Sequence, residues 1–300
     1  MKLIRWHYLM MPTYLTQMFN IKMLQYENGC VEIRTYTDVV GNKPVNMPEE
    51  LLIVKQQVAK THNKLKAHTV YNPFYEEEMG LYDLDEIEIA DARKKHSMRN
   101  SYSRTVQKVF SCARQCNWKY FITLTFAPDV VDRYDFTACM KKARRWFNNQ
   151  QQRSATDLQY LIVPEMHKDG AWHVHGLLAQ CDGLRLSFSE HYHYSGLKAY
   201  HLADWDYGIN YVVEVDDVDK VSGYITKYIT KDLCMATEGK RRYFRSNNIP
   251  VPAEDVFLVE GNEKLAFPEL LADSLGVVKV YEKEISGYTG VKYQYFKSEV

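Results

Sequence analysis

The chain has 300 residues, enough for one large domain or two modest ones. Hydrophobic residues make up 46% and charged residues 25%, which is ordinary for a folded protein and excludes a disordered or collagen-like chain. The 38 Lys and Arg balance 38 Asp and Glu, so any nucleic acid would have to be bound through local basic patches.

The sequence carries no sign of a membrane or secretory segment. No apolar run approaches the ~18 residues of a membrane span. Arg5, His7 and Pro12 interrupt the apolar N-terminal stretch, which is atypical of a signal peptide. The 6 cysteines contain no Cys-x-x-Cys spacing and no disulfide pattern. We therefore expect a cytoplasmic protein with reduced thiols and no membrane partner.

Charge changes sign abruptly along the chain. Acidic residues without a base occupy Glu76 to Asp91, and basic residues without an acid occupy Arg93 to Lys108. This predicts a boundary near residue 92. We expect an N-terminal region of unassigned role at 1–92, a functional domain at 93–250 and a C-terminal extension at 251–300. Within the first region, 30–36 has the pattern of a strand and 48–66 that of a helix.

From residue 98 onward the elements follow in a clear order. Helical spacing over 98–116 precedes an alternating strand at 120–126. A helix is predicted at 136–152, and two apolar strands, 158–166 and 172–179, flank a Lys-Asp-Gly turn. A strand at 208–215 and a helix at 218–232 complete the series. This order predicts an α+β fold.

The two apolar strands carry Glu165, His173 and His175. Side chains at i and i+2 of a strand project from the same face, so the two imidazoles lie together. A two-residue turn would place Glu165 on the opposite face. A three-residue loop, Lys168 to Gly170 with Gly170 left-handed, pairs Glu165 with His173 and joins it to them. We predict the three-residue loop.

One carboxylate and two imidazoles suit Mg²⁺ or Mn²⁺ for phosphate chemistry, and such a set also binds Fe or Zn. The alternative is a surface pair of His beside an unrelated Glu. The same spacing recurs at His191-Tyr192-His193, but no carboxylate lies on a partner strand there. We predict that this second pair lies in a loop.

A second group of residues lies in the predicted helix 218–232. Helical geometry places Tyr224, Lys227, Tyr228 and Lys231 in one stripe beside an apolar one. Phenols are weak nucleophiles at neutral pH, and nearby ammonium groups lower their pKa and hold phosphate. Taken alone, the tyrosines are equally explained as residues that flank a core.

In chain order, the motifs are Phe121-Ile-Thr-Leu-Thr-Phe126, His173-Val-His-Gly176 and Tyr224-Ile-Thr-Lys-Tyr-Ile-Thr-Lys231. Together they resemble the HUH superfamily of rolling-circle replication initiators, especially those of single-stranded DNA phages of the microvirus kind. The resemblance covers about residues 98–245. Members with a third His ligand have no counterpart here, and Glu165 takes that place.

The resemblance implies a central antiparallel sheet of about five strands with packed helices. It implies Mg²⁺ or Mn²⁺ held by Glu165, His173 and His175, and attack on DNA by Tyr224 or Tyr228 with Lys227 beside them. The product would be a 5′-phosphotyrosine and a free 3′-hydroxyl that starts rolling-circle replication. Expected DNA contacts are Lys141, Lys142, Arg144, Arg145, Lys231, Arg241 and Arg242.

The implied partner is single-stranded or supercoiled origin DNA. The chain contains no G-x-x-x-x-G-K phosphate loop, so a host helicase is expected to unwind the DNA and a host polymerase to extend it. Two other functions compete with this one. A two-His-one-carboxylate oxygenase would use the hairpin and leave the tyrosines idle. A non-catalytic DNA-binding replication protein would use only the basic residues.

Overall fold

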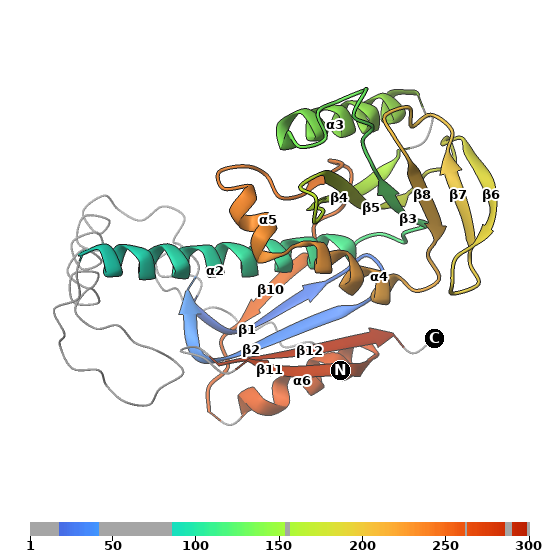
Figure 1. Ribbon diagram of the computed structural model, residues 1–300. Coiled ribbons are helices and arrows are strands. Elements are labelled where there is room, and N and C mark those ends of the chain that lie inside the picture. The colour runs from blue at the N-terminus through green and yellow to red at the C-terminus, as the bar shows by residue number, and fades with distance from the viewer. Residues whose placement is uncertain (1–17, 42–85, 154–156, 262, 286–289, 299–300) are drawn as a thin grey trace. The chain divides into compact units, whose positions relative to one another are not determined.

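The computed structural model describes residues 18–41, 86–153, 157–261, 263–285 and 290–298 (Figure 1). The chain divides into two compact units, one from residues 1–25, 29–91 and 253–300, the other from 26–28 and 92–252. Each unit is built on an antiparallel sheet with helices, which confirms the predicted α+β class. The helix predicted at 48–66 lies outside the described residues. None of the helices within these ranges is long and apolar enough to cross a membrane.

The first unit joins strands from both ends of the chain. Its strand order is β10 (Ala253–Phe257), β1 (Met18–Gln25), β2 (Val31–Gly41), β12 (Val291–Ser298) and β11 (Val277–Ile285), and α6 (Glu263–Leu275) belongs to the same unit. Ile21, Ile33 and Phe296 are fully buried in its core. The strand predicted at 30–36 is confirmed as part of β2. The segments that we treated as separate terminal regions thus share one sheet.

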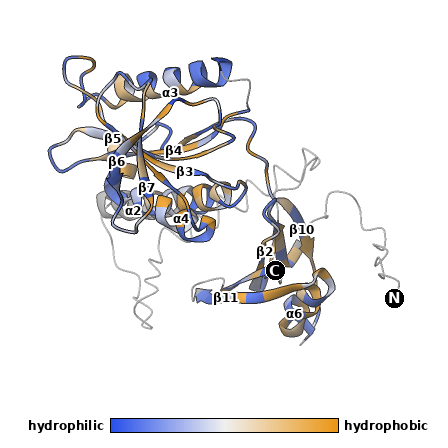
Figure 2. Ribbon diagram, turned by 90° about the vertical axis from the view of Figure 1, so that its right-hand side faces the viewer, coloured by the Kyte–Doolittle hydropathy of each residue, from blue (hydrophilic) through white to orange (hydrophobic). Residues whose placement is uncertain are grey.

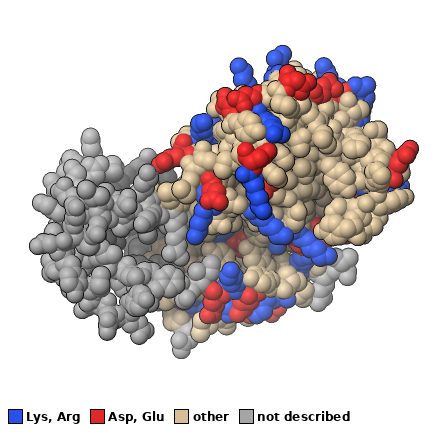
Figure 3. Space-filling view, in the orientation of Figure 1, with Lys and Arg blue, Asp and Glu red and all other residues tan. Residues whose placement is uncertain are grey.

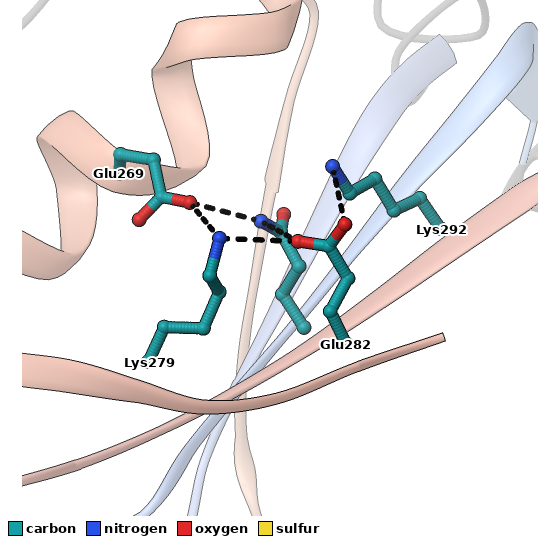
Figure 4. A network of polar contacts seen from close by, with 5 residues as sticks. Glu269, Lys279, Glu282 and Lys292 are labelled. Carbon is teal, nitrogen blue, oxygen red and sulfur yellow. Dashed lines mark hydrogen bonds and ion pairs between the residues drawn. The ribbon is translucent and has the colours of Figure 1, made fainter. Parts of the chain in front are cut away.

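A polar network ties α6 to β11 and β12 (Figure 4). The ammonium of Lys279 lies 2.7 Å from a Glu269 oxygen and 3.1 Å from a Glu282 oxygen. Lys292 contacts the other Glu282 oxygen at 2.9 Å, and this hydrogen bond lowers the pKa of Glu282. Gln294 donates to both carboxylates. The exposed ion pairs fix orientation more than they add stability.

The second unit contains a seven-stranded sheet, where about five strands were expected. Its order is β6 (Leu186–Tyr192), β7 (Lys198–Leu202), β8 (Asn210–Glu214), β3 (Tyr120–Leu124), β5 (Trp172–Ala179), β4 (Gln159–Met166) and β9 (Phe244–Arg245). The β6–β7 hairpin at one edge and the two-residue β9 at the other account for the difference. His191 and Tyr192 lie in β6, so the loop predicted there was wrong.

Helices cover both faces of this sheet (Figure 2). On one face, Phe147 of α3 (Phe136–Arg153) stacks on Tyr160 of β4, with ring centroids 4.4 Å apart. The other face packs against the end of α2 (Glu86–Ala113), α4 (Val218–Ile225), the 3₁₀ turn η1 (Thr226–Tyr228) and α5 (Lys231–Ala236). Odd-numbered residues of β3, β4 and β5, including Phe121 and His175, point toward α4 and η1.

The single helix predicted over 218–232 is interrupted. Ile229 has extended backbone angles, and Thr230 then begins α5 by accepting a hydrogen bond from the Leu233 N–H at 3.0 Å. The Thr230 hydroxyl competes with helix continuation, which is the usual behaviour of such residues at a helix start. The predicted apolar stripe survives, because Ile225 and Ile229 are both buried. Lys231 consequently belongs to a different helix from the two tyrosines.

Two glycines near the predicted motifs should respond oppositely to alanine. A Cβ at Gly176 would lie 2.7 Å from the Ile162 Cγ2 atom, whereas a Cβ at Gly223 in α4 would meet nothing within 4 Å. We expect Gly176→Ala to lower the free energy of unfolding by about 1–3 kcal/mol through overpacking. Gly223→Ala should raise it by about 0.5–1 kcal/mol by stiffening the unfolded chain. Urea denaturation of both variants checks this, and equal shifts would contradict it.

Candidate active site

The β4–β5 hairpin has the predicted register. The His167 N–H bonds to the Ala171 carbonyl at 2.8 Å and closes a loop of Lys168, Asp169 and Gly170. Gly170 has φ +87°, a left-handed angle that favours glycine. Glu165 is paired with His173 across the strands. Since β9 pairs only with Leu161 and Ile162, the missing N–H of Pro164 removes no bond to β9.

Glu165 and His175 form the central contact of this face. The Nε2 atom of His175 lies 2.7 Å from Oε2 of Glu165, and this hydrogen bond lowers the pKa of Glu165. An ionised carboxylate only accepts, so Nε2 carries the hydrogen in this arrangement. The other ring nitrogen, Nδ1, lies 3.1 Å from the hydroxyl of Thr123 on β3. The ring is 7% exposed and is held at both nitrogens.

His173 shares this face but has different neighbours. Its ring stacks on His167 with centroids 5.1 Å apart, and His167 pairs with Asp169 at 3.3 Å. Burial lowers the pKa of His173, which favours the neutral imidazole. Within the described ranges, no group of three or more His, Cys, Asp or Glu side chains is arranged to hold a metal ion. As they stand, Glu165 and His175 satisfy each other and His173 lies beside them.

The two predicted tyrosines cover the imidazole. The Tyr228 ring lies parallel to the His175 ring, with centroids 3.7 Å apart and an angle of 10°. Its hydroxyl donates to the Tyr224 hydroxyl at 3.1 Å. Phe121 of β3 contacts both tyrosine rings, at 5.3 Å for Tyr224 and 6.2 Å for Tyr228. Two phenols, an imidazole and a carboxylate therefore lie in one contiguous group.

Exposure distinguishes the two tyrosines. Tyr224 is 39% exposed, while Tyr228 is partly buried. Burial raises the pKa of the Tyr228 hydroxyl above its ordinary value, and the hydrogen bond to Tyr224 and the charge of Glu165 raise it further. The Lys227 ammonium lies over the Tyr224 ring, 4.3 Å from its centroid, and Lys231 is exposed at the start of α5. In the absence of added positive charge, Tyr228 is held as a neutral phenol.

Most of the predicted DNA contacts lie apart from this group. Lys141, Lys142, Arg144 and Arg145 belong to α3, which covers the opposite face of the sheet. Figure 3 shows basic side chains along the upper edge of the molecule, where α3 lies in Figure 1, with acidic ones beside them. Arg241 is exposed. The Arg242 guanidinium is tied to Ser101, Thr105 and the Cys234 carbonyl.

Two functional neighbours were missed at the level of residues. Thr123 and Phe121 lie in the strand motif that carried the resemblance, but no role was assigned to either side chain. Their alternation in the strand puts both on one face, which is the signal that would have found them. What the strand pattern lacked was its partner: β3 pairs Thr123 with His175, a contact 52 residues away in sequence.

Removing the Thr123 hydroxyl should uncouple the imidazole from β3. Thr123→Val leaves Nδ1 of a buried ring without a partner, which costs about 1–3 kcal/mol of unfolding free energy. Thr125→Val is the matched control, because the Thr125 hydroxyl bonds an exposed carbonyl of Ile209 that water can satisfy. Thermal melting of both variants measures the difference. A loss no larger for Thr123→Val than for Thr125→Val would show that this bond does not fix His175.

Comparison with known proteins gives one match. Residues 119–233 match the model of a family of replication-associated proteins, the one that includes ORF2. The matched segment runs from β3 to α5 and therefore contains the strand, the hairpin and both tyrosines. No curated protein and no solved structure matches the chain. The family match supports a role for this protein in the initiation of replication.

Proposed function

We propose that the protein is a DNA nicking and joining enzyme that starts rolling-circle replication through a covalent tyrosine intermediate. One observation carries the proposal: two tyrosine hydroxyls lie 3.1 Å apart directly above a carboxylate–imidazole pair. The group falls inside the segment that matches a replication-associated family. A core explanation of the tyrosines accounts for the buried Ile225 and Ile229 beside them, but not for the exposed Tyr224.

The donor set fits Mg²⁺ or Mn²⁺ in chemical type. Glu165, His175 and His173 would hold the ion, which would polarise a phosphate and stabilise its developing charge. His175 can serve as a ligand because Thr123 is both donor and acceptor. With the hydrogen on Nδ1, the ring donates to the Thr123 hydroxyl and leaves Nε2 free. A neutral His173 is likewise in the protonation state that a ligand requires.

The transfer step needs no co-reactant. A phenolic oxygen forms a bond to phosphorus while the bond from phosphorus to the 3′-oxygen breaks, and the phenol proton ends on the leaving 3′-oxygen. Tyr228 donates to Tyr224, and Tyr224 reaches solvent, so this pair offers the proton an exit. Joining is the reverse: a 3′-hydroxyl attacks the phosphotyrosine and releases the phenol. The phosphodiester energy is retained throughout, so rejoining consumes no nucleoside triphosphate.

The proposal includes the DNA and its partners. Single-stranded or supercoiled origin DNA is the substrate, and a host helicase and polymerase would act on the nicked product. The oxygenase alternative gives no role to Tyr224 and Tyr228, which stack on and beside the proposed ligands. A non-catalytic replication protein is the outcome if no covalent product forms.

The two hydroxyls are close enough to serve one phosphate in turn. We expect Tyr224→Phe and Tyr228→Phe each to retain part of the nicking activity and the double variant to lose it. The assay uses a pool of random single-stranded oligonucleotides labelled at the 3′ end, with Mn²⁺, and scores labelled protein that resists detergent. Tyr192→Phe, an exposed tyrosine of β6, is the control and should match the unaltered protein. An active double variant would refute nucleophilic tyrosines.

The metal proposal has its own test. His173 is only partly buried, so His173→Ala should preserve the fold while lowering nicking by at least about 10- to 100-fold, the loss typical even of outer-sphere changes. His191→Ala, in an exposed pair of the same spacing, is the matched control. Excess chelator should abolish nicking, and added Mn²⁺ should restore it. Full activity in chelator would remove the metal from the account without removing the tyrosines.

A further inference from the structure

A pocket of about 430 Å³ lies between α3 and the segment 241–247, where β9 pairs with the edge of β4. Its lining contains four arginines, Arg144, Arg241, Arg242 and Arg245, and no acidic residue. None of the lining residues belongs to the tyrosine site. Tyr160, which also lines the pocket, points to the face of the sheet opposite Glu165. The pocket is thus a second concave site in the same unit.

The charges in this pocket are not neutralised within the described part of the chain. None of the four arginines forms an ion pair there. Arg242 donates to the Ser101 hydroxyl at 2.6 Å, and Arg245 donates to the Ile249 carbonyl at 3.3 Å. These acceptors are uncharged, so they hold the guanidinium groups in place and leave their charge intact. The Nε atom of Arg242 is buried without a partner.

The remaining polar groups in the pocket are also donors. Arg144 lies close enough to Tyr160 to oppose the rise that burial causes in the pKa of that phenol. Arg245 and Arg241 act in the same way on Tyr243. The guanidinium of Arg144 also lies over the Phe244 ring, 5.3 Å from its centroid. Guanidinium and phenol groups therefore converge on one space, which suits a ligand with several anionic oxygens.

We propose that this pocket binds a phosphate group of a nucleotide, supplied by a DNA strand that contacts the protein at the β9 edge. The volume lies within the range of small-ligand pockets, and guanidinium groups recognise phosphate through paired hydrogen bonds. The source that we favour is a strand, because residues 119–233 match a replication-associated family. A mononucleotide presents the same chemistry and is distinguished below. Cleavage plays no part in this inference.

The pocket assigns different roles to neighbouring bases of α3. Arg144 lines it together with Asn148 and Gln151, which follow at helical spacing, whereas Lys141 and Arg145 do not line it. A diffuse basic surface would use all of them alike. The test therefore compares Arg144→Ala/Arg241→Ala with Lys141→Ala/Arg145→Ala. Each double variant removes two exposed charges.

Binding of a fluorescein-labelled random single-stranded oligonucleotide is measured by anisotropy as a function of salt, with the full chain. The pocket pair should weaken binding at least about tenfold and reduce the log–log salt slope by roughly 1.4, or about 0.7 for each phosphate contact. The control pair should change both much less. Thermal melting verifies that both variants fold. Equal losses in the two pairs, or no loss in the pocket pair, would overturn the proposal.

Competition separates the two sources of phosphate. If deoxythymidine monophosphate displaces the oligonucleotide from the unaltered protein but not from Arg144→Ala/Arg241→Ala, the pocket accepts a terminal phosphate. If it does not compete while the pocket pair still loses affinity, the ligand is an internal phosphodiester of the strand. Both results support a phosphate site. A protein that binds in this way but never nicks DNA would refute the proposed function and leave this inference standing.

Discussion

The contact between Glu165 and His175 organises the functional face of the seven-stranded sheet. It forms because the β4–β5 loop has three residues, which places the carboxylate and both imidazoles on the same side. With Thr123 at its other nitrogen, the His175 ring is fixed in a plane against which Tyr228 stacks. A loop shorter by one residue would turn Glu165 to the α3 face. The position of the tyrosines therefore depends on the length of a turn.

The interruption at Ile229 has a second effect on this face. Burial of Ile225 and Ile229 anchors the segment on both sides of the 3₁₀ turn, so Tyr228 is held between two core residues. A tighter turn follows α4 and ends at once, after which α5 begins on its own cap. The result is one partly buried and one exposed phenol joined by a hydrogen bond. This asymmetry gives the two hydroxyls different proton affinities before any substrate binds.

Periodicity and spacing predicted much of the second unit. The alternation in β3 and the two apolar strands reported their own burial, so these elements and the hairpin register were correct. The break at Ile229 was not predicted, because the apolar stripe through Ile225 and Ile229 has the same spacing on either side of it. The β6 strand at His191 was missed because its side chains are largely exposed and carry no apolar alternation. Contacts between distant segments, such as Thr123 with His175 or Arg242 with Ser101, leave no local pattern at all.

The central claim is that Tyr224 and Tyr228 are the groups that join to DNA. Its most direct measurement is mass spectrometry of the protein after reaction with single-stranded DNA and Mn²⁺, nuclease trimming and proteolysis. The account predicts peptides in which a nucleotide is linked through its 5′-phosphate to Tyr224 in some molecules and to Tyr228 in others. Nucleotide adducts on another residue, or cleaved DNA without any tyrosine adduct, would contradict it.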